Sequence, residues 1–238
     1  MRSTSPLFQP ASRLSFSITH VLLLFVIGLL VVDSAHAQCT TSWTNAGGGL
    51  WSDAGNWDDG VPDAADDACL TLDATYTVDL DVDATVNSLT LGAMSGANTQ
   101  ALAIGPFDDL TVLMPSTITA DGEIVWSGGS LNGPGAGVFN NAGLITLTGA
   151  SVKTLAGDNG GAVDPVLRNT GTVSHEEGQL NANLSAGVEN AGLYDLQADV
   201  DLDYASGNAP GFTNEAAGTL RKSTGGAQSF FDVPFTNS

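Results

Sequence analysis

A repeated corner built from asparagine and glycine limits the folds open to this chain more than any other feature. In each unit an apolar residue precedes an asparagine by two positions, and in the first four units a glycine follows. The asparagines are Asn141, Asn169, Asn190, Asn214 and Asn237, at steps of 28, 21, 24 and 23 residues. A period in the twenties indicates a solenoid, because one unit cannot bury its own apolar face and has to stack on its neighbours.

The residues of the unit predict short strands joined by a sharp bend. Asparagine and glycine adopt left-handed backbone conformations more easily than other residues, so the Asn-x-Gly segment predicts a corner. A short alternating segment follows each glycine, and its second position is apolar: Ile145, Val173, Tyr194 and Leu220. Alternation of this kind predicts a strand with one buried side. Stacked units would place the asparagines in one column, where their amides can form a hydrogen-bonded ladder.

The first half of the chain keeps the strands but lacks the regular corner. Val78, Leu80 and Val82 alternate with aspartates, and further short apolar segments follow between glycine-rich turns. A helical stripe of apolar residues is missing after residue 37. We therefore expect an all-β chain with an N-terminal cap over residues 38–72 and solenoid repeats over 73–238. The fifth unit stops at Ser238, which suggests that the repeats are truncated at the C-terminus.

The first 37 residues have the features of a secretory signal peptide. Arg2 and Arg13 precede an apolar run over residues 21–32, and Ala35-His36-Ala37 supplies a small-x-small cleavage site. The run is too short for a membrane span, which needs roughly 20 apolar residues. We expect cleavage between Ala37 and Gln38, export from the cytoplasm, and no membrane-spanning segment afterwards.

Charge and composition exclude several classes of partner. The chain carries 26 acidic and 6 basic residues, and without the first 37 residues it carries 25 and 4. Such a chain has no basic surface for nucleic acid and no polybasic patch for a membrane. With 42% hydrophobic residues and only 13% charged ones, it is apolar enough to bury a core.

The two cysteines of the sequence predict a disulfide. Cys39 and Cys69 are the only cysteines, and both precede the repeats in a chain with an export signal. A bridge between them would close a loop of about 30 residues, which on the chain-entropy estimate stabilises by about 3 kcal/mol. Two free thiols are the alternative. A lipid anchor on Cys39 is disfavoured, because Gln38 stands where such a signal needs a small residue.

The start of the exported chain resembles a known group of proteins. The resemblance is to secreted bacterial parallel β-helix proteins, in particular autotransporter passengers and haemagglutinin-like surface proteins. It is carried by Trp51, Asn56-Trp57, Gly60, Pro62, Asp66, the strand in Thr75 to Asp83, and Val86-Asn87-Ser88-Leu89-Thr90-Leu91. It implies a right-handed parallel β-helix on the cell surface or outside the cell.

Two Asp-x-Asp-x-Asp runs are candidates for a calcium site. The sequence predicts that each run presents three carboxylates on one strand face, and Ca²⁺ can bridge carboxylates of neighbouring coils. The alternative is a solvated acidic face. The residues concerned are Asp79, Asp81, Asp83, Asp199, Asp201 and Asp203.

Catalytic groups are scarce. The adjacent pairs Asp58-Asp59, Asp66-Asp67 and Asp108-Asp109 point to opposite faces if they lie in strands, so adjacency alone gives no glycosidase dyad. His175 beside Glu176 and Glu177 can be interpreted as an acid–base group or as a polar residue at the rim of a core column. We assign no catalytic residue.

Three tryptophans lie close together in the sequence near the cysteines. Trp43, Trp51 and Trp57 would stack on sugar rings if exposed, or would close the open end of the solenoid if buried. We expect the cap.

These observations favour a non-catalytic secreted or cell-surface scaffold of the adhesin type that binds glycans or proteins. A polysaccharide lyase or glycoside hydrolase of the same fold is the alternative. No cofactor is expected apart from Ca²⁺ at the aspartate runs.

Overall fold

Short strands separated by corners make up most of the chain. The computed structural model describes residues 39–93, 97–160 and 163–238. Among these residues the one helical element is the 3₁₀ turn η1 (Ala54–Asn56), and the described residues belong to one compact unit. The expectation of an all-β chain is confirmed.

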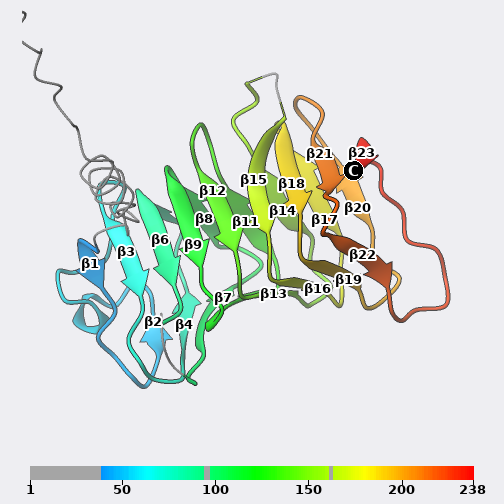
Figure 1. The fold of residues 1–238 in the computed structure, drawn as a ribbon. Helices are drawn as coiled ribbons and strands as arrows, with labels where there is room; N and C mark the ends of the chain where they lie inside the picture. The colour runs from blue at the N-terminus through cyan, green and yellow to red at the C-terminus, as the bar shows by residue number, and fades with distance from the viewer. Residues whose placement is uncertain (1–38, 94–96, 161–162) are drawn as a thin grey trace, which may run out of the picture. The chain divides into compact units, whose positions relative to one another are not determined.

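The strands form three parallel sheets (Figure 1). Sheet 1 contains β1 (Thr41–Ser42), β3 (Asp67–Leu70), β6 (Ser88–Leu91), β9 (Pro115–Ile118), β12 (Val138–Asn141), β15 (Asp164–Asn169), β18 (Ala186–Asn190), β21 (Gly211–Asn214) and β23 (Phe235–Asn237). Sheet 2 contains β2 (Gly49–Leu50), β4 (Tyr76–Leu80), β7 (Gln100–Ile104), β10 (Gly122–Trp126), β13 (Leu144–Leu147), β16 (Thr172–His175), β19 (Leu193–Leu196) and β22 (Thr219–Lys222). Sheet 3 contains β5 (Ala84–Val86), β8 (Asp109–Val112), β11 (Gly129–Asn132), β14 (Lys153–Ala156), β17 (Leu180–Asn183) and β20 (Leu202–Tyr204).

From β3 to β22 the chain visits the three sheets in turn and returns to sheet 1 one strand further along, whereas between β2 and β3, and between β22 and β23, it returns without a strand in sheet 3. β12, β13 and β14 form one such coil, and β15 then pairs in parallel with β12. The eight strands of sheet 2 mark eight coils in the described part of the chain. A parallel β-solenoid is therefore confirmed, while its right-handed winding stays a prediction.

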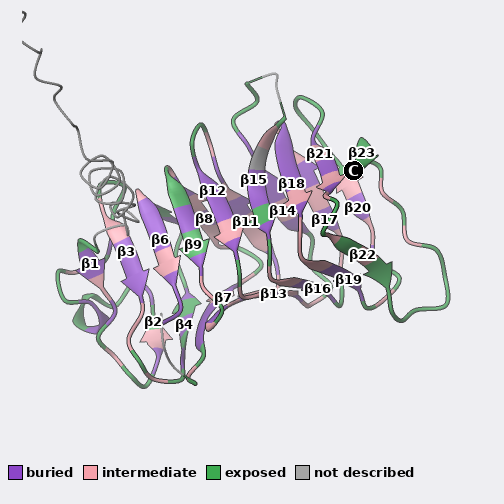
Figure 2. Ribbon diagram, viewed as in Figure 1, coloured by how far each residue is buried: buried purple, intermediate pink, exposed green. Residues whose placement is uncertain are grey.

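The core lies inside the coils, where apolar side chains from successive strands form columns. Ile124, Ile145 and Val173 occupy one register position on neighbouring strands of sheet 2, and all three are fully buried. Burial of one such side chain contributes about 1.5–3 kcal/mol. Figure 2 shows the alternation of buried and less buried residues along the strands, and the greater exposure of β22 and β23.

The asparagine column forms a continuous hydrogen-bonded ladder at the corner between sheets 1 and 2. The Nδ2 atom of each asparagine donates to Oδ1 of the next, at 2.7 Å for the first three steps and 2.9 Å for the last. Asn141, Asn169 and Asn190 also donate across the corner to backbone carbonyls, such as Thr172 O at 3.1 Å from Asn141. Because both amide hydrogens find acceptors, these asparagines can lie in the core with 0–1% of their surface exposed.

The glycines of the corner have a different role from the one expected. Gly143, Gly171, Gly192 and Gly218 do not have positive φ angles. A Cβ atom at Gly143 would instead collide with the carbonyl oxygens of Gly122 and Thr119 in the preceding coil. Glycine is therefore required by close stacking of the coils, and the left-handed conformation predicted for this position is wrong.

The missing corner signal in the first half also has a structural reason. Leu70, Leu91 and Ile118 occupy the register position that Asn141 and Asn169 take in later coils. These apolar residues are fully buried. The column is therefore apolar in the earlier coils, and it consists of hydrogen-bonded asparagines from Asn141 onward.

Candidate functional site

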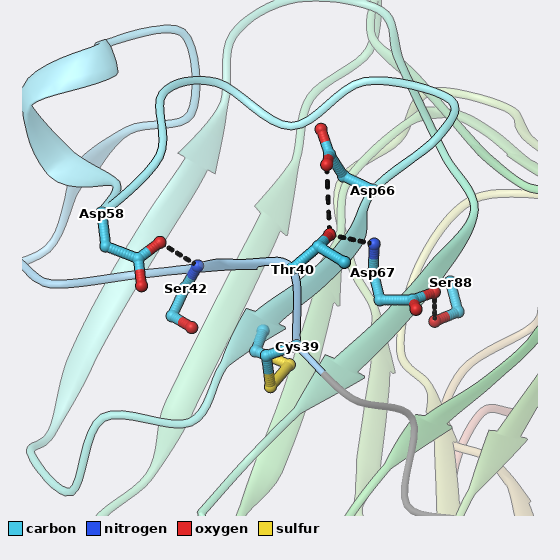
Figure 3. Close-up of a disulfide and its surroundings, with 8 residues drawn as sticks. Cys39, Thr40, Ser42, Asp58, Asp66, Asp67 and Ser88 are labelled. Carbon is cyan, nitrogen blue, oxygen red and sulfur yellow. Dashed lines mark hydrogen bonds between the residues drawn. A yellow bond between two sulfur atoms is a disulfide. The ribbon is translucent and has the colours of Figure 1, made fainter.

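The predicted disulfide ties the beginning of the described chain to sheet 1. Cys39 and Cys69 are bonded, with 5.7 Å between their Cα atoms, and neither sulfur is a free thiol. Beside the bond, the Thr40 hydroxyl donates to Asp66 at 3.1 Å and accepts the Asp67 amide at 2.8 Å (Figure 3). The bridge therefore supports the short pairing of β1 with β3.

The tryptophan cluster closes the N-terminal end of the solenoid, as expected. Trp43, Trp51 and Trp57 have 0–5% of their surface exposed, and Trp57 packs edge-on against the other two rings. The indole nitrogen of Trp57 donates to Trp51 O at 2.8 Å, and that of Trp43 donates to Asn45 O at 2.6 Å. These buried rings cannot stack on a sugar.

The first aspartate run lies across a corner instead of along one strand face. β4 ends at Leu80 and β5 begins at Ala84, so only Asp79 is in a strand. Asp81 accepts hydrogen bonds from the backbone and side chain of Ser52, which lower its pKa against the opposing effect of burial. Asp83 accepts the Asp109 amide at 3.0 Å. The prediction of three carboxylates on one strand face is wrong, because the strands are too short to hold the run.

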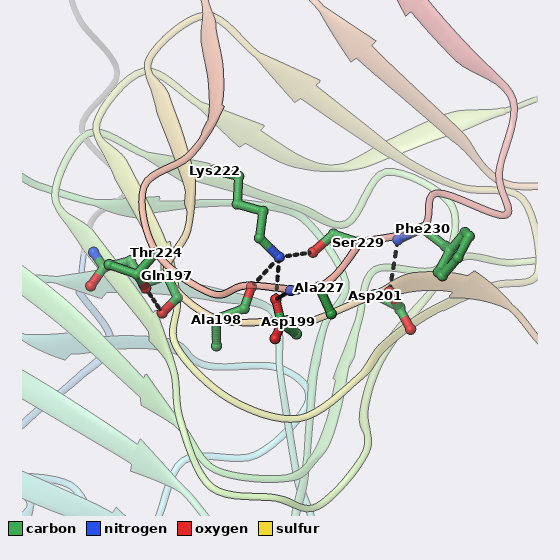
Figure 4. A network of polar contacts seen from close by, with 9 residues as sticks. All are labelled: Gln197, Ala198, Asp199, Asp201, Lys222, Thr224, Ala227, Ser229 and Phe230. Carbon is green, nitrogen blue, oxygen red and sulfur yellow. Dashed lines mark hydrogen bonds and ion pairs between the residues drawn. The ribbon is translucent and has the colours of Figure 1, made fainter.

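The second aspartate run fastens the segment that follows β22 (Figure 4). Asp199 Oδ1 accepts from Lys222 Nζ at 2.7 Å and from the Ala227 amide at 2.9 Å. Its pKa is lowered, and the hydrogen bond from Lys222 is the largest cause of this shift. Asp201 accepts the Phe230 amide at 2.7 Å, and only Asp203 lies in a strand, where Gln179 donates to it.

These contacts give the aspartates a structural role at the corner between sheets 2 and 3. Within residues 39–93, 97–160 and 163–238, no group of three or more histidine, cysteine, aspartate or glutamate side chains is placed to hold a metal ion. In the second run an ammonium group already neutralises Asp199. Calcium at the two runs stays a prediction.

His175 lies in the core and has no access to solvent. It occupies the register position between Leu147 and Leu196 and is 0% exposed. Its Nε2 lies 3.0 Å from Gly178 O, and its Nδ1 lies 3.5 Å from the Tyr194 hydroxyl. Burial lowers the pKa of His175 to about 4, so the ring is neutral at physiological pH. Both the acid–base interpretation and the rim interpretation are therefore corrected.

A buried lysine next to this histidine was not found by sequence analysis. Lys153 is 0% exposed, and its ammonium donates to the carbonyls of Gly149, Ser151 and Glu177 at 2.6–3.0 Å. Burial lowers its pKa, while the nearby charge of Glu177 opposes that shift. Gly178 makes room for the ammonium, because a Cβ atom there would lie 2.7 Å from Nζ.

The adjacent acidic pairs also serve the fold. Asp58 accepts the Ser42 amide at 2.7 Å, and Asp67 accepts from Asn87 and Ser88 at 2.7 and 2.6 Å. The pKa of Asp108 is raised by burial and by the neighbouring carboxylates of Asp83, Asp81 and Asp109. We assign none of these pairs the roles of the two carboxyl groups that flank the scissile bond in a glycosidase.

The outer face of sheet 1 carries a charged pair that sequence analysis also missed. Arg168 Nε lies 2.8 Å from Glu189 Oε2, and both side chains are about half exposed, at 49% and 41%. In the repeats each residue directly precedes a ladder asparagine, so the outward position was readable from the sequence. The partner on the next coil followed only from the register, in which Arg168 pairs with Glu189.

The described residues contain no helix long and apolar enough to cross a membrane. Comparisons of the chain with protein-family models, curated proteins and solved structures find no match. The β-solenoid architecture agrees with the resemblance described above. Membership of the autotransporter or haemagglutinin-like proteins gains no support from these comparisons.

Proposed function

We propose that this protein is a secreted or cell-surface scaffold of the adhesin type, which binds glycans or proteins without transforming them. The observation that carries the proposal is the stack of eight coils, which displays continuous outer faces along its axis. A long repeated face offers many weak contacts in series, and linked contacts give avidity that a single one lacks.

The placement of the chemically active side chains supports a binding role. His175 and Lys153 are buried, and four of the six carboxylates in the aspartate runs accept hydrogen bonds from backbone amides. The disulfide is compatible with an oxidising compartment, and the signal peptide proposed for residues 1–37 would deliver the chain there. That segment lies outside the described residues.

A combined binding and turnover assay tests this proposal. The protein starting at Gln38 is applied to arrays of plant, algal and microbial glycans and of extracellular matrix proteins, with and without Ca²⁺. We expect saturable binding and no release of shorter or unsaturated sugars. Turnover that is lost when a single aspartate is changed to asparagine would instead establish the lyase or hydrolase alternative.

A further inference from the structure

Two hollows lie on the outer face of sheet 1, on either side of the Arg168–Glu189 pair. The first has a volume of about 220 Å³ and the second of about 190 Å³. Arg168 and Asp164 line the first together with residues of β9, β12 and the segment before β12. Val163, Gly187, Val188, Glu189, Gly211 and Thr213 line the second.

The second hollow exists because two strands carry glycine where a side chain would point outward. Gly187 and Gly211 are register partners in β18 and β21. A Cβ atom at Gly187 would lie 2.9 Å from Asp164 O and 3.0 Å from Val163 Cγ1, and one at Gly211 would lie 3.1 Å from Val163 Cγ1. Side chains at these positions would therefore fill the space. Neither glycine has a positive φ angle; the close approach of Asp164 O requires glycine at 187, whereas at Gly211 only the Val163 side chain is near.

The groups around the hollows can form directional hydrogen bonds with hydroxyls. Arg168 supplies donors, Glu189 and Asp164 supply acceptors, and the Thr213 hydroxyl can do both. Hydrogen bonds in which one partner is charged are roughly twice as strong as neutral ones. The Arg168–Glu189 pair holds both groups in place between the hollows at 2.8 Å.

We propose that the two hollows are adjacent subsites for a neutral glycan chain that runs along the solenoid axis. This inference rests on the proposed function and assigns it a place and a ligand class. Each hollow is smaller than the pockets of about 300–1,000 Å³ that hold drug-sized ligands, which suits a single sugar ring. The lining residues come from β9, β12, β15, β18 and β21, a span of about 19 Å at the usual strand spacing. That span fits an oligosaccharide.

The charge of the surroundings selects neutral sugars over acidic ones. Two carboxylates, Asp164 and Glu189, face one guanidinium at the hollows, and the whole chain has a formal net charge of −20. Uronic or sulfated sugars would be repelled by this field. The lining contains no aromatic ring, so binding depends on hydrogen bonds and on the apolar surface of Val163.

Calorimetric titration of the protein starting at Gln38 tests the inference. The probes are hexasaccharides of cellulose, mannan, xylan and chitin, with hexagalacturonate as the acidic comparison. Gly211→Val fills the second hollow, and Arg168→Ala removes the guanidinium at an exposed position where folding is not at risk. Ala103→Val adds carbon atoms to an outward position of β7 on sheet 2 and is the matched control. Circular dichroism verifies that each variant is folded.

We expect one neutral hexasaccharide to bind and to protect the amides of residues 166–168 and 187–190 from hydrogen exchange. Gly211→Val and Arg168→Ala should each weaken binding at least tenfold, and Ala103→Val should change it less than twofold. Unchanged affinity in both Gly211→Val and Arg168→Ala, or binding of hexagalacturonate alone, overturns the assignment of this site while the scaffold function stands. Binding of proteins on the arrays without binding of any glycan also overturns the assignment and leaves the scaffold function standing. A protein that binds nothing on the arrays contradicts both proposals.

Discussion

The ammonium group of Lys222 lies 2.7 Å from Oδ1 of Asp199, within the second of the two aspartate runs that are candidates for a calcium site in the sequence. The same ammonium donates to Ala198 O at 3.0 Å and to the Ser229 hydroxyl at 2.9 Å. One cation thus joins β22, the corner before β20 and the segment that follows β22. The acidic run works here as a fastening for the chain.

Loss of this cation should loosen the segment over residues 223–230. We expect Lys222→Met to increase proteolytic cleavage there severalfold. The free energy of unfolding should change little, because exposed ion pairs contribute little to stability. Limited proteolysis with mass spectrometry measures the effect. Arg168→Met breaks an exposed pair that holds no loop and is the control, so equal cleavage in both variants would contradict the role of Lys222.

The asparagine ladder should be worth more than its single hydrogen bonds suggest. Asn190→Ala leaves the Nδ2 of Asn169 and the Oδ1 of Asn214 without their partners in the core. Buried polar groups left unpaired cost about 1–3 kcal/mol each, so we expect a loss of about 3 kcal/mol. Thr117→Ala, at an exposed position of β9, should cost less than about 0.5 kcal/mol. Urea unfolding of both variants measures the two losses. Equal unfolding midpoints for Asn190→Ala and Thr117→Ala would rule out a stabilising ladder.

His175 should make the protein sensitive to mild acid. Its pKa is about 4 in the folded chain and about 6.5 when unfolded, so the unfolded state binds the extra proton between these values. The contribution of His175 to the free energy of unfolding is therefore at its maximum above pH 6.5, and it falls by roughly 3 kcal/mol as the pH drops to 4. Lys153, Tyr194 and Asp201 surround or influence this ring and remain unchanged in the test.

His175→Leu reproduces the residue found at this position in the neighbouring coils and should remove most of that fall. Urea midpoints are measured from pH 4 to 7 in the original protein and in the variant. The difference between the two curves isolates the effect of His175, because the carboxylates titrate in both proteins and their effect cancels. Parallel curves for the two proteins would show that His175 does not titrate as its burial requires.

The exported protein should begin at Gln38 and contain an intact Cys39–Cys69 bond. Intact-mass analysis of secreted material, with alkylation before and after reduction, measures both features. The double variant Cys39→Ala with Cys69→Ala should lose about 3 kcal/mol, because its unfolded chain is no longer restricted by the loop. Alkylation without reductant, or an unchanged urea midpoint in the variant, would be the contrary result.

The sequence predicted those features that repeat from coil to coil. The asparagine column was readable because a hydrogen-bonded amide needs the same residue in the next coil, and that repetition leaves a period. The role of Gly143 was not readable, since the carbonyls it avoids belong to the preceding coil. Lys153 and Gly178 likewise fit each other only once the register of β14 and β17 is known.

The hollows on sheet 1 show a second limit of sequence reasoning. The second hollow arises where Gly187 and Gly211 lack side chains, and absent atoms leave no pattern to recognise. The strand placement predicted for the aspartate runs was wrong for another reason. Their alternation resembles a strand, but β4 ends at Leu80 and β20 begins at Leu202, so Asp81, Asp83, Asp199 and Asp201 lie in the turns between sheets 2 and 3.

The asparagine ladder has a consequence for the opposite corner of the coils that carry it, between sheets 3 and 1. There the connection is Leu184-Ser185 between β17 and β18, and it comprises residues 205–210 between β20 and β21. Because the amides fix the rise from coil to coil, length can vary at this edge without shifting the strands. The coils from Asn141 onward therefore share one corner of fixed structure, between sheets 1 and 2, and one corner of variable length, between sheets 3 and 1. Additional surface can be formed at the variable corner in each coil separately.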